Sequence, residues 1–440
     1  MPVISFFSII SLVVLAIVYF FLITEKVNKV IVAILGASIL ILSQVFQTAT
    51  HTSQDNAFTF IAHNLDILGF VIGMMILVGI IRESGIFEAI AIWLVKKTRA
   101  NPFALMAILG YLTLGMTALF SNIPTVLIII PMALVLIKQL NLPYFPFLFI
   151  ILVMANIGGA MTPISDPTTY YQAKTVGLGF GEVAGNSGLI VLVLSVVSLI
   201  YANLVFRKEL SAVKIDTEAI SLFNPLSALR NKKVLVRGTP ILVIAILLMV
   251  CKGLIHSFFG LTLDNATIAL SAAFFAMLIF HREPRKVFTE LIDWEIIFFF
   301  MGLFIIVGAL EFTKVVELLA HFLVQISQGS TQVLTALIAI GSTIISTFID
   351  NVPYNITMVG AIQAMEKSGI WVYPLWWALN LGTSIGGAGS PIGAACNVIA
   401  LGQTEKDGYH TKFSYYLKVA VPLILLNGLI TYVLISLRYF

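Results

Sequence analysis

The chain has 440 residues, of which 59% are hydrophobic and only 10% are charged. Soluble domains carry about 25% charged residues, so this composition excludes a soluble globular protein and predicts an integral membrane protein. The formal net charge of +4 lies in short basic loops, which orient a chain in a bilayer and do not indicate a nucleic-acid partner.

Apolar segments long enough for membrane spans recur along the whole chain. In the first half they lie near 3–23, 27–46, 67–81, 103–120, 123–139, 144–158 and 186–206. In the second half they lie near 239–255, 266–281, 295–312, 331–349, 352–366, 372–386 and 415–437. Several are too short to cross a hydrocarbon core of about 30 Å as straight helices, so we expect re-entrant hairpins around 110–139 and 340–366.

Charge divides the chain into two halves. A basic stretch, 207–238, is predicted to be a cytoplasmic linker between a first transmembrane repeat, 1–206, and a second repeat, 239–440. The loop 82–102 is also basic, whereas its counterpart 313–330 has a single lysine and no arginine. Matching loops are therefore expected on opposite sides of the membrane, which makes the repeats inverted.

Two polar motifs recur in the two halves. Ser121-Asn122-Ile123-Pro124 returns 229 positions later as Asp350-Asn351-Val352-Pro353. Gly158-Gly159 with Thr162-Pro163 returns as Gly386-Gly387 with Ser390-Pro391. Duplicated helix breaks of this kind form the substrate site of secondary transporters near the bilayer midplane.

These breaks supply the candidate ligands. New half-helices beginning at the prolines would direct free N–H groups at the site, and the glycine turns would offer carbonyl and hydroxyl oxygens to Na⁺ or another small ion. Asp166 and Asp350 are the acidic residues expected at membrane depth, where they would bind Na⁺ or H⁺. The predicted substrate- and ion-binding residues are Ser121, Asn122, Thr125, Asn156, Gly158, Gly159, Thr162, Asp166, Asp350, Asn351, Asn355, Gly386, Gly387, Ser390 and Asn397.

A purely structural interpretation competes with this one. Ser121, Asn122, Asp350 and Asn351 would then be helix caps, and the glycines close helix contacts. Asp166 would likewise only cap the turn before Pro167. The two aspartates are not repeat equivalents, because Ser121 stands opposite Asp350 and Ala394 opposite Asp166.

Other chemistry finds little support in the sequence. Lys174 and Glu182 are expected in loops. The histidines have no metal-binding spacing, no phosphate-binding loop is present, and no nucleophile–base pair is visible. We therefore expect neither an enzyme nor a cofactor, apart from a bound Na⁺.

The residues at both breaks resemble the ion transporter superfamily, in the branch of arsenite permeases, D-type sodium/proton antiporters and the P protein. The resemblance is strongest over 348–353 and 382–398, and includes 155–160 with Asp166-Pro167. It implies an all-α polytopic fold of two inverted repeats with broken helices, a homodimer and elevator-type alternating access.

The preferred function is secondary active ion transport linked to Na⁺ and H⁺ across the plasma (bacterial inner) membrane. Arsenite or antimonite efflux is the first alternative, and a sodium-coupled carboxylate or anion carrier the second. The expected partners are thus a small inorganic ion or small anion, lipid and a second copy of the chain. An anion carrier remains open because helix N-termini alone can bind anions.

Overall fold

The fold is all-α within the part of the chain that the structure describes. This computed structural model describes residues 5–24, 27–48, 51–97, 101–212 and 224–440, and every regular element in these ranges is helical. Residues 213–223, in the middle of the predicted linker, lie outside the described residues. In these ranges seven helices are long and apolar enough to cross a membrane, or eight if one bent pair counts as a span. The chain is a multi-pass integral membrane protein.

The two halves contain corresponding series of helices. The first half comprises α1 (Phe6–Thr24), α2 (Lys29–Leu42), α3 (Ser53–His63), α4 (Leu65–Arg82), α5 (Ile86–Lys96), α6 (Pro102–Phe120), α7 (Asn122–Gln139), α8 (Tyr144–Gly158), α9 (Pro167–Val176), α10 (Phe180–Val183), the π-helix η1 (Ala184–Gly188), α11 (Leu189–Val205) and α12 (Arg207–Ser211). The second comprises the 3₁₀ turn η2 (Pro225–Ala228), α14 (Lys232–Phe259), α15 (Asn265–Ile279), α16 (Pro284–Glu290), α17 (Trp294–Phe312), α18 (Val315–Ile326), α19 (Thr331–Ile345), α20 (Asn351–Lys367), α21 (Tyr373–Gly387), α22 (Ala395–Lys406) and α23 (Phe413–Tyr439).

Short polar helices were missed by the hydrophobic pattern. The sequence placed Lys174 and Glu182 in loops, and this is wrong, because they lie on α9 and α10. Helix α9 has ten residues, begins after the Asp166 cap with a proline at its first position, and ends at Gly177 with φ of +76°. A helix this short and polar has no apolar face to detect, so only its end signals announce it.

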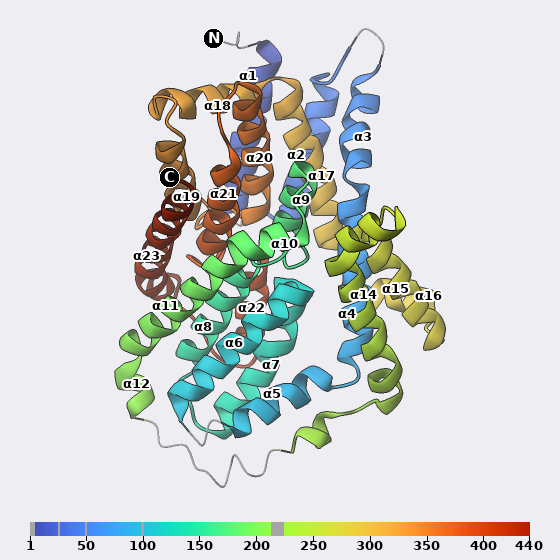
Figure 1. The fold of residues 1–440 in the computed structure, drawn as a ribbon, viewed down its shortest axis with the longest axis vertical. Coiled ribbons are helices and arrows are strands. Elements are labelled where there is room, and N and C mark those ends of the chain that lie inside the picture. The colour runs from blue at the N-terminus through green and yellow to red at the C-terminus, as the bar shows by residue number, and fades with distance from the viewer. Residues whose placement is uncertain (1–4, 25–26, 49–50, 98–100, 213–223) are drawn as a thin grey trace.

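Corresponding helices lie at opposite ends of the molecule. Figure 1 shows α5 at the lower end and α18 at the upper end, with α6 and α7 in the lower half and α19 and α20 in the upper half. Helices α18 and α19 meet at a bend of 115°. This is the arrangement that inverted repeats produce.

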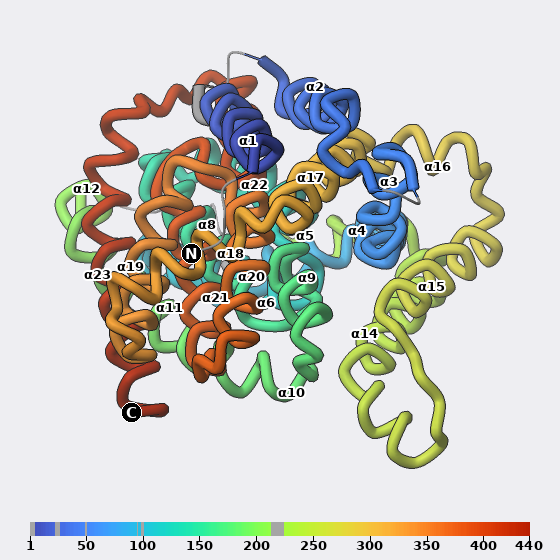
Figure 2. Tube along the Cα trace, turned by 90° about the horizontal axis from the view of Figure 1, so that it is seen from above, coloured from blue at the N-terminus to red at the C-terminus, as the bar shows by residue number. Residues whose placement is uncertain are grey.

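In each half, a helix that precedes the hairpin packs against a helix of the other half. Helix α4 packs on α15, and α17 packs on α2; Figure 2 shows α14 and α15 at one edge of the molecule. Both contacts pass through repeat-equivalent glycines. A Cβ atom on Gly73 would lie 2.6 Å from the carbonyl carbon of Ala269, and one on Gly302 would lie 2.8 Å from that of Ala33. The absence of a side chain allows the backbones to approach.

Candidate transport site

Four helices begin at one small cavity. Helix α7 starts at Asn122, α9 at Pro167, α20 at Asn351 and α22 at Ala395, and all four residues line a cavity of about 30 Å³. Each helix N-terminus carries unpaired N–H groups and a partial positive charge. The repeats thus direct two pairs of positive helix ends at one point. The remaining lining residues are Lys29, Ile123, Asp166, Ile296, Phe299, Phe300, Asp350 and Val352.

Asp166 is buried and held by three hydrogen bonds. Its Oδ1 accepts from the backbone N–H of Thr168 at 2.9 Å and from the Thr168 hydroxyl at 2.7 Å. Its Oδ2 accepts from the side-chain amide of Asn122 at 2.6 Å. The cap interpretation is correct for this residue, yet the Asn122 bond also joins the α9 cap to the tip of the α6–α7 hairpin. Its side chain is 3% exposed.

Asp350 is more accessible. Within the described residues its side chain makes one hydrogen bond, from the backbone N–H of Val352 to Oδ1 at 3.1 Å. It also lines a second cavity of about 320 Å³, together with Asp293 and Glu295 at the start of α17. Of the two carboxylates, Asp350 is therefore the one with an oxygen available to a ligand.

Lys29 belongs to the site, although the sequence gave no reason to include it. It lines both cavities with Asp350, and its Nζ lies 5.4 Å from the ring centroid of Phe299. The residue stands at the start of a predicted span, where a lysine ordinarily marks the end of a loop. Nothing in the local pattern distinguishes it from such a flanking charge.

The two glycine turns are tied across the repeats. The Thr169 hydroxyl on α9 contacts the Gly159 carbonyl at 2.7 Å and the side-chain oxygen of Asn380, on α21, at 2.8 Å. On α22, the Asn397 amide donates to the Gly387 carbonyl at 2.7 Å, while its side-chain oxygen accepts from Asn156, on α8, at 2.8 Å. Each turn is thus fixed to a helix of the other repeat.

Asn380 makes further contacts with the first turn. Its amide donates to the Ala160 carbonyl at 3.1 Å and to the Ser187 hydroxyl of the π-helix at 3.0 Å. Neither Asn380 nor Thr169 was among the predicted ligands. Their roles depend on contacts between helices more than 200 residues apart, which sequence spacing does not encode.

The other predicted residues surround the cavities without lining them. The Thr125 hydroxyl donates to the Ser121 carbonyl, and that of Thr162 to the Ala118 carbonyl. Ser390 repeats the Thr162 contact on Thr347, and the Asn355 amide lies 3.3 Å from the Thr383 hydroxyl. The predicted glycines allow neighbouring atoms to approach closely. In the first repeat, a Cβ on Gly158 would lie 3.2 Å from the Leu114 carbonyl oxygen, and one on Gly159 would lie 3.2 Å from Asp166 Oδ2. In the second repeat, a Cβ on Gly386 would lie 2.5 Å from the Thr343 carbonyl oxygen, and one on Gly387 would lie 2.6 Å from Asn156 Oδ1.

Asp166 and Ala394, which the repeat alignment places at corresponding positions, have matching backbone conformations. Asp166 caps α9 with φ and ψ of −153° and 142°, and Ala394 caps α22 with −151° and 147°. The backbones match although only one side chain is acidic. The two hairpin tips differ more: Ser121 has φ of +76°, whereas Asp350 has φ of −48°.

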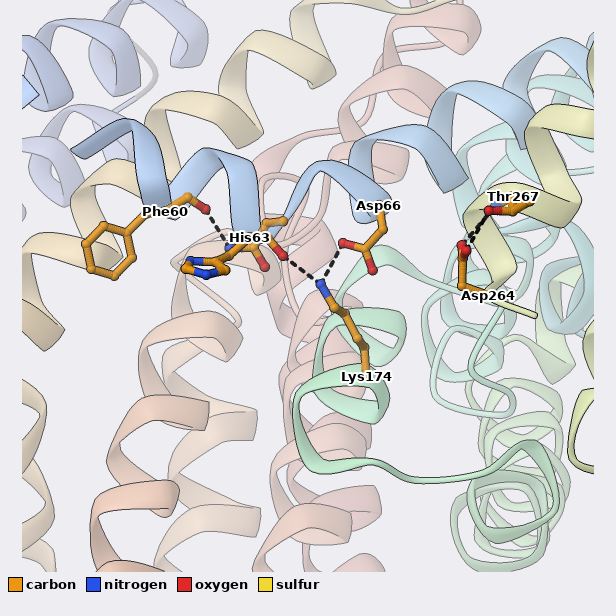
Figure 3. Close-up of polar contacts among 7 residues, drawn as sticks. Phe60, His63, Asp66, Lys174, Asp264 and Thr267 are labelled. Atoms are coloured by element: carbon orange, nitrogen blue, oxygen red, sulfur yellow. Dashed lines mark hydrogen bonds and ion pairs between the residues drawn. The ribbon is translucent and has the colours of Figure 1, made fainter. Parts of the chain in front are cut away.

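The two repeats contribute corresponding faces to the site, and these differ: the face of the first repeat is packed, and that of the second is open. We call the contact of Asp66, Phe70, Tyr170 and Lys174 the α9 face. There Lys174 Nζ lies 2.6 Å from Asp66 Oδ1 and 2.7 Å from the His63 carbonyl (Figure 3). The rings of Tyr170 and Phe70 stack with centroids 4.6 Å apart.

The corresponding α22 face comprises Glu295, Phe299, Val398 and Gly402. Glu295 and Val398 line the larger cavity, and Phe299 lines the smaller one. Glu295 accepts a hydrogen bond from Asn28 at 3.3 Å. Val398 and Gly402 occupy the positions that correspond to Tyr170 and Lys174. One face is closed by an ion pair and stacked rings, while the other retains a cavity that reaches Asp350.

The charges at the site are of both signs. Two carboxylates and one ammonium group face a cavity that also receives four positive helix ends. The carboxylate of Asp350 could bind a cation, and the helix N-termini together with Lys29 could bind an anion. Within the described ranges no group of three or more His, Cys, Asp or Glu side chains gathers as a metal site.

Comparison with known proteins agrees with this architecture. Residues 19–382 match the family described as citrate transporter. A transporter of Mycobacterium tuberculosis is 30% identical over 444 residues, with 98% of this chain and 99% of that protein aligned. The P protein of Mus musculus is 24% identical, and the alignment covers 94% of this chain and 58% of that protein.

A solved structure resembles the fold as well. The crystal structure of the YdaH transporter of Alcanivorax borkumensis superposes with a TM-score of 0.59 at 15% identity, covering 87% of this chain and 86% of that one. At this identity the likeness concerns the fold alone. The family match spans most of the chain, and the chain is therefore a secondary transporter that belongs to the citrate transporter family.

Proposed function

We propose that the protein is a Na⁺- and H⁺-linked transporter that exchanges ions at Asp350 by alternating access. The observation that carries this proposal is that Asp166 and Asp350, from different repeats, line one cavity at the junction of four helix N-termini. An acidic group at membrane depth needs a cation or a proton when it is ionised, so a carrier can use it to couple the two.

The two aspartates have different roles in this proposal. Asp166 already accepts three hydrogen bonds and fixes the α9 cap to Asn122. Asp350 has a free oxygen and faces the larger cavity. We therefore assign ion exchange to Asp350 and positioning of the hairpin tip to Asp166. Movement of the hairpins and glycine turns against α2, α4, α15 and α17, as an elevator, would expose the site alternately through the α22 and α9 faces.

A carboxylate or other small anion is the second candidate substrate. The four helix N-termini and Lys29 favour a negative group, and the matching family is described as citrate transporter. In this case the aspartates would hold a coupling Na⁺ and the anion would bind beside it. Arsenite efflux gains no specific observation, since neither Cys251 nor Cys396 lines the two cavities.

Proteoliposomes with an internal pH-sensitive dye would test the proposal. A proton gradient is imposed, and Na⁺, Li⁺, K⁺, citrate or arsenite is added in turn. Proton movement driven by Na⁺ or Li⁺, abolished in Asp350→Asn and reduced in Asp166→Asn, is the expected result. Proton movement that needs citrate, with no response to a cation alone, would replace cation exchange by anion transport.

A further inference from the structure

We propose that Lys29 is a tethered cation that competes with the transported cation for the carboxylate of Asp350. This inference rests on the cation-linked function proposed above and adds a residue that determines cation affinity. It follows from the position of Lys29 at the first turn of α2, where its side chain lines both cavities that Asp350 lines.

The charge of Lys29 is not neutralised by a close carboxylate in the described structure. The ion pairs within 4.0 Å in the described ranges join other residues. Its contact is with the ring of Phe299, at 5.4 Å from the centroid. A half-buried lysine that forms no ion pair within the described residues contributes little to stability, whereas a charge at a site of this kind is ordinarily functional.

Four acidic residues line the cavities that Lys29 lines. Asp166 and Asp350 line the smaller cavity, and Asp293 and Glu295, at the start of α17, line the larger one together with Asp350. Asp166 is occupied by Thr168 and Asn122, and Glu295 accepts from Asn28. Asp293 caps α17 through the N–H of Ile296, and it lines only the larger cavity, as Glu295 does. Asp350 is therefore the carboxylate that lines both cavities and has an oxygen open to a cation.

The flexible four-carbon side chain of Lys29 allows its ammonium group and a free ion to alternate as the cation beside the Asp350 carboxylate. When no ion is bound, Lys29 offsets the charge of Asp350. When Na⁺ binds, the ammonium group leaves the carboxylate for the ring of Phe299. In this structure Nζ lies 5.4 Å from the centroid of that ring, so the side chain can reach this withdrawn position. Competition of this kind lowers the affinity for the ion, so that a bound ion is released after the site has reoriented.

The test is the apparent KM for Na⁺ in dye-loaded proteoliposomes for wild type, Lys29→Gln and the charge-keeping control Lys29→Arg. Lys29→Gln removes the competing charge and is expected to lower KM about tenfold. The free energy that corresponds to this change is a small part of the Coulomb energy between two nearby charges. Lys29→Arg is expected to stay within about twofold of wild type. Phe299→Leu removes the withdrawn position and should raise KM about threefold.

The outcomes separate this inference from the function beneath it. If wild type moves protons in response to Na⁺ but Lys29→Gln leaves KM unchanged or raises it, the competition is wrong while cation exchange stands. If wild type shows no response to any cation, both are wrong. Should Lys29→Gln not fold, an unchanged KM in Phe299→Leu overturns the inference by itself.

Discussion

Lys174 and Asp66 form an ion pair, with 2.6 Å between Nζ and Oδ1, that joins α9 to the start of α4. Their side chains are 34% and 27% exposed, so solvent screening limits the pair to about 1 kcal/mol or less. Such an energy is too small to matter for folding. It is large enough to shift an equilibrium between closed and open α9 faces about fivefold.

Breaking this pair should therefore open the α9 face without unfolding the protein. In a background with Cys251 and Cys396 replaced by serine, Ala173→Cys, at a buried position of α9 outside the α9 face, would report exposure to a membrane-impermeant maleimide. Lys174→Met is expected to raise its labelling rate about fivefold. The exchanged pair Lys174→Asp with Asp66→Lys should return the rate towards its original value. Equal labelling in all variants would exclude this pair from control of the face.

Ser121 is the second place where a substitution is informative. Its φ of +76° and ψ of 158° belong to a region that glycine occupies at much lower cost than other residues. Ser121→Gly should raise the free energy of unfolding by about 1 kcal/mol, and Ser121→Val should lower it by more than that. Thermal unfolding in detergent measures both.

The matched control for Ser121 is Asp350, at the same point of the other hairpin. There φ is −48° and the side chain caps α20, so Asp350→Gly should destabilise slightly, by about 0.3 kcal/mol, in the opposite direction to Ser121→Gly. If glycine had the same effect at both tips, the difference in backbone strain would have no energetic consequence.

Gly73 is predicted to tolerate no side chain. Because a Cβ would lie 2.6 Å from the Ala269 backbone, Gly73→Ala must separate α4 from α15, at about 1–3 kcal/mol. Gly115, in the interior of α6, has open space around it, so Gly115→Ala should leave the unfolding midpoint unchanged or raise it slightly. A similar loss in both variants would indicate a general intolerance of these helices instead of a close contact.

Asn380 is expected to be sensitive to substitution, because its side chain holds the first glycine turn. Asn380→Ala removes an amide that contacts Thr169, Ala160 and Ser187, and we expect a loss of about 1–3 kcal/mol. Asn427→Ala provides a control, since within the described residues that buried amide makes one hydrogen bond, to Ser198. Equal losses at both positions would contradict a special role for Asn380 in holding the first turn.

The sequence was informative where the signal was local. Asn122, Asn351 and Asp350 could be assigned to helix starts because a polar cap is followed by proline, and these residues do meet at one cavity. The pairing of Asp166 with Ala394 came from aligning the repeats, and their backbone angles agree. The first inference depends on neighbouring residues alone, and the second on matching one local motif to its copy in the other repeat.

Long-range contacts were beyond the same reasoning. Lys29 resembles an ordinary flanking lysine until α2 is packed against α17, where Lys29 lines the cavity that Asp350 also lines. Lys174 was assigned to a loop because α9 lacks an apolar face. The pairs Thr169–Asn380 and Asn156–Asn397 depend on how two repeats interpenetrate, which no pattern within either repeat specifies.

The matched caps of α9 and α22 have an evolutionary consequence. Duplication supplied two equivalent positions beside the site, and the backbone accepts aspartate at one and alanine at the other with almost the same angles. The number of ionisable groups is therefore independent of the fold. A lineage built on this scaffold can gain or lose a coupled charge through a single codon, so related carriers of one architecture can differ in stoichiometry and in their response to membrane voltage.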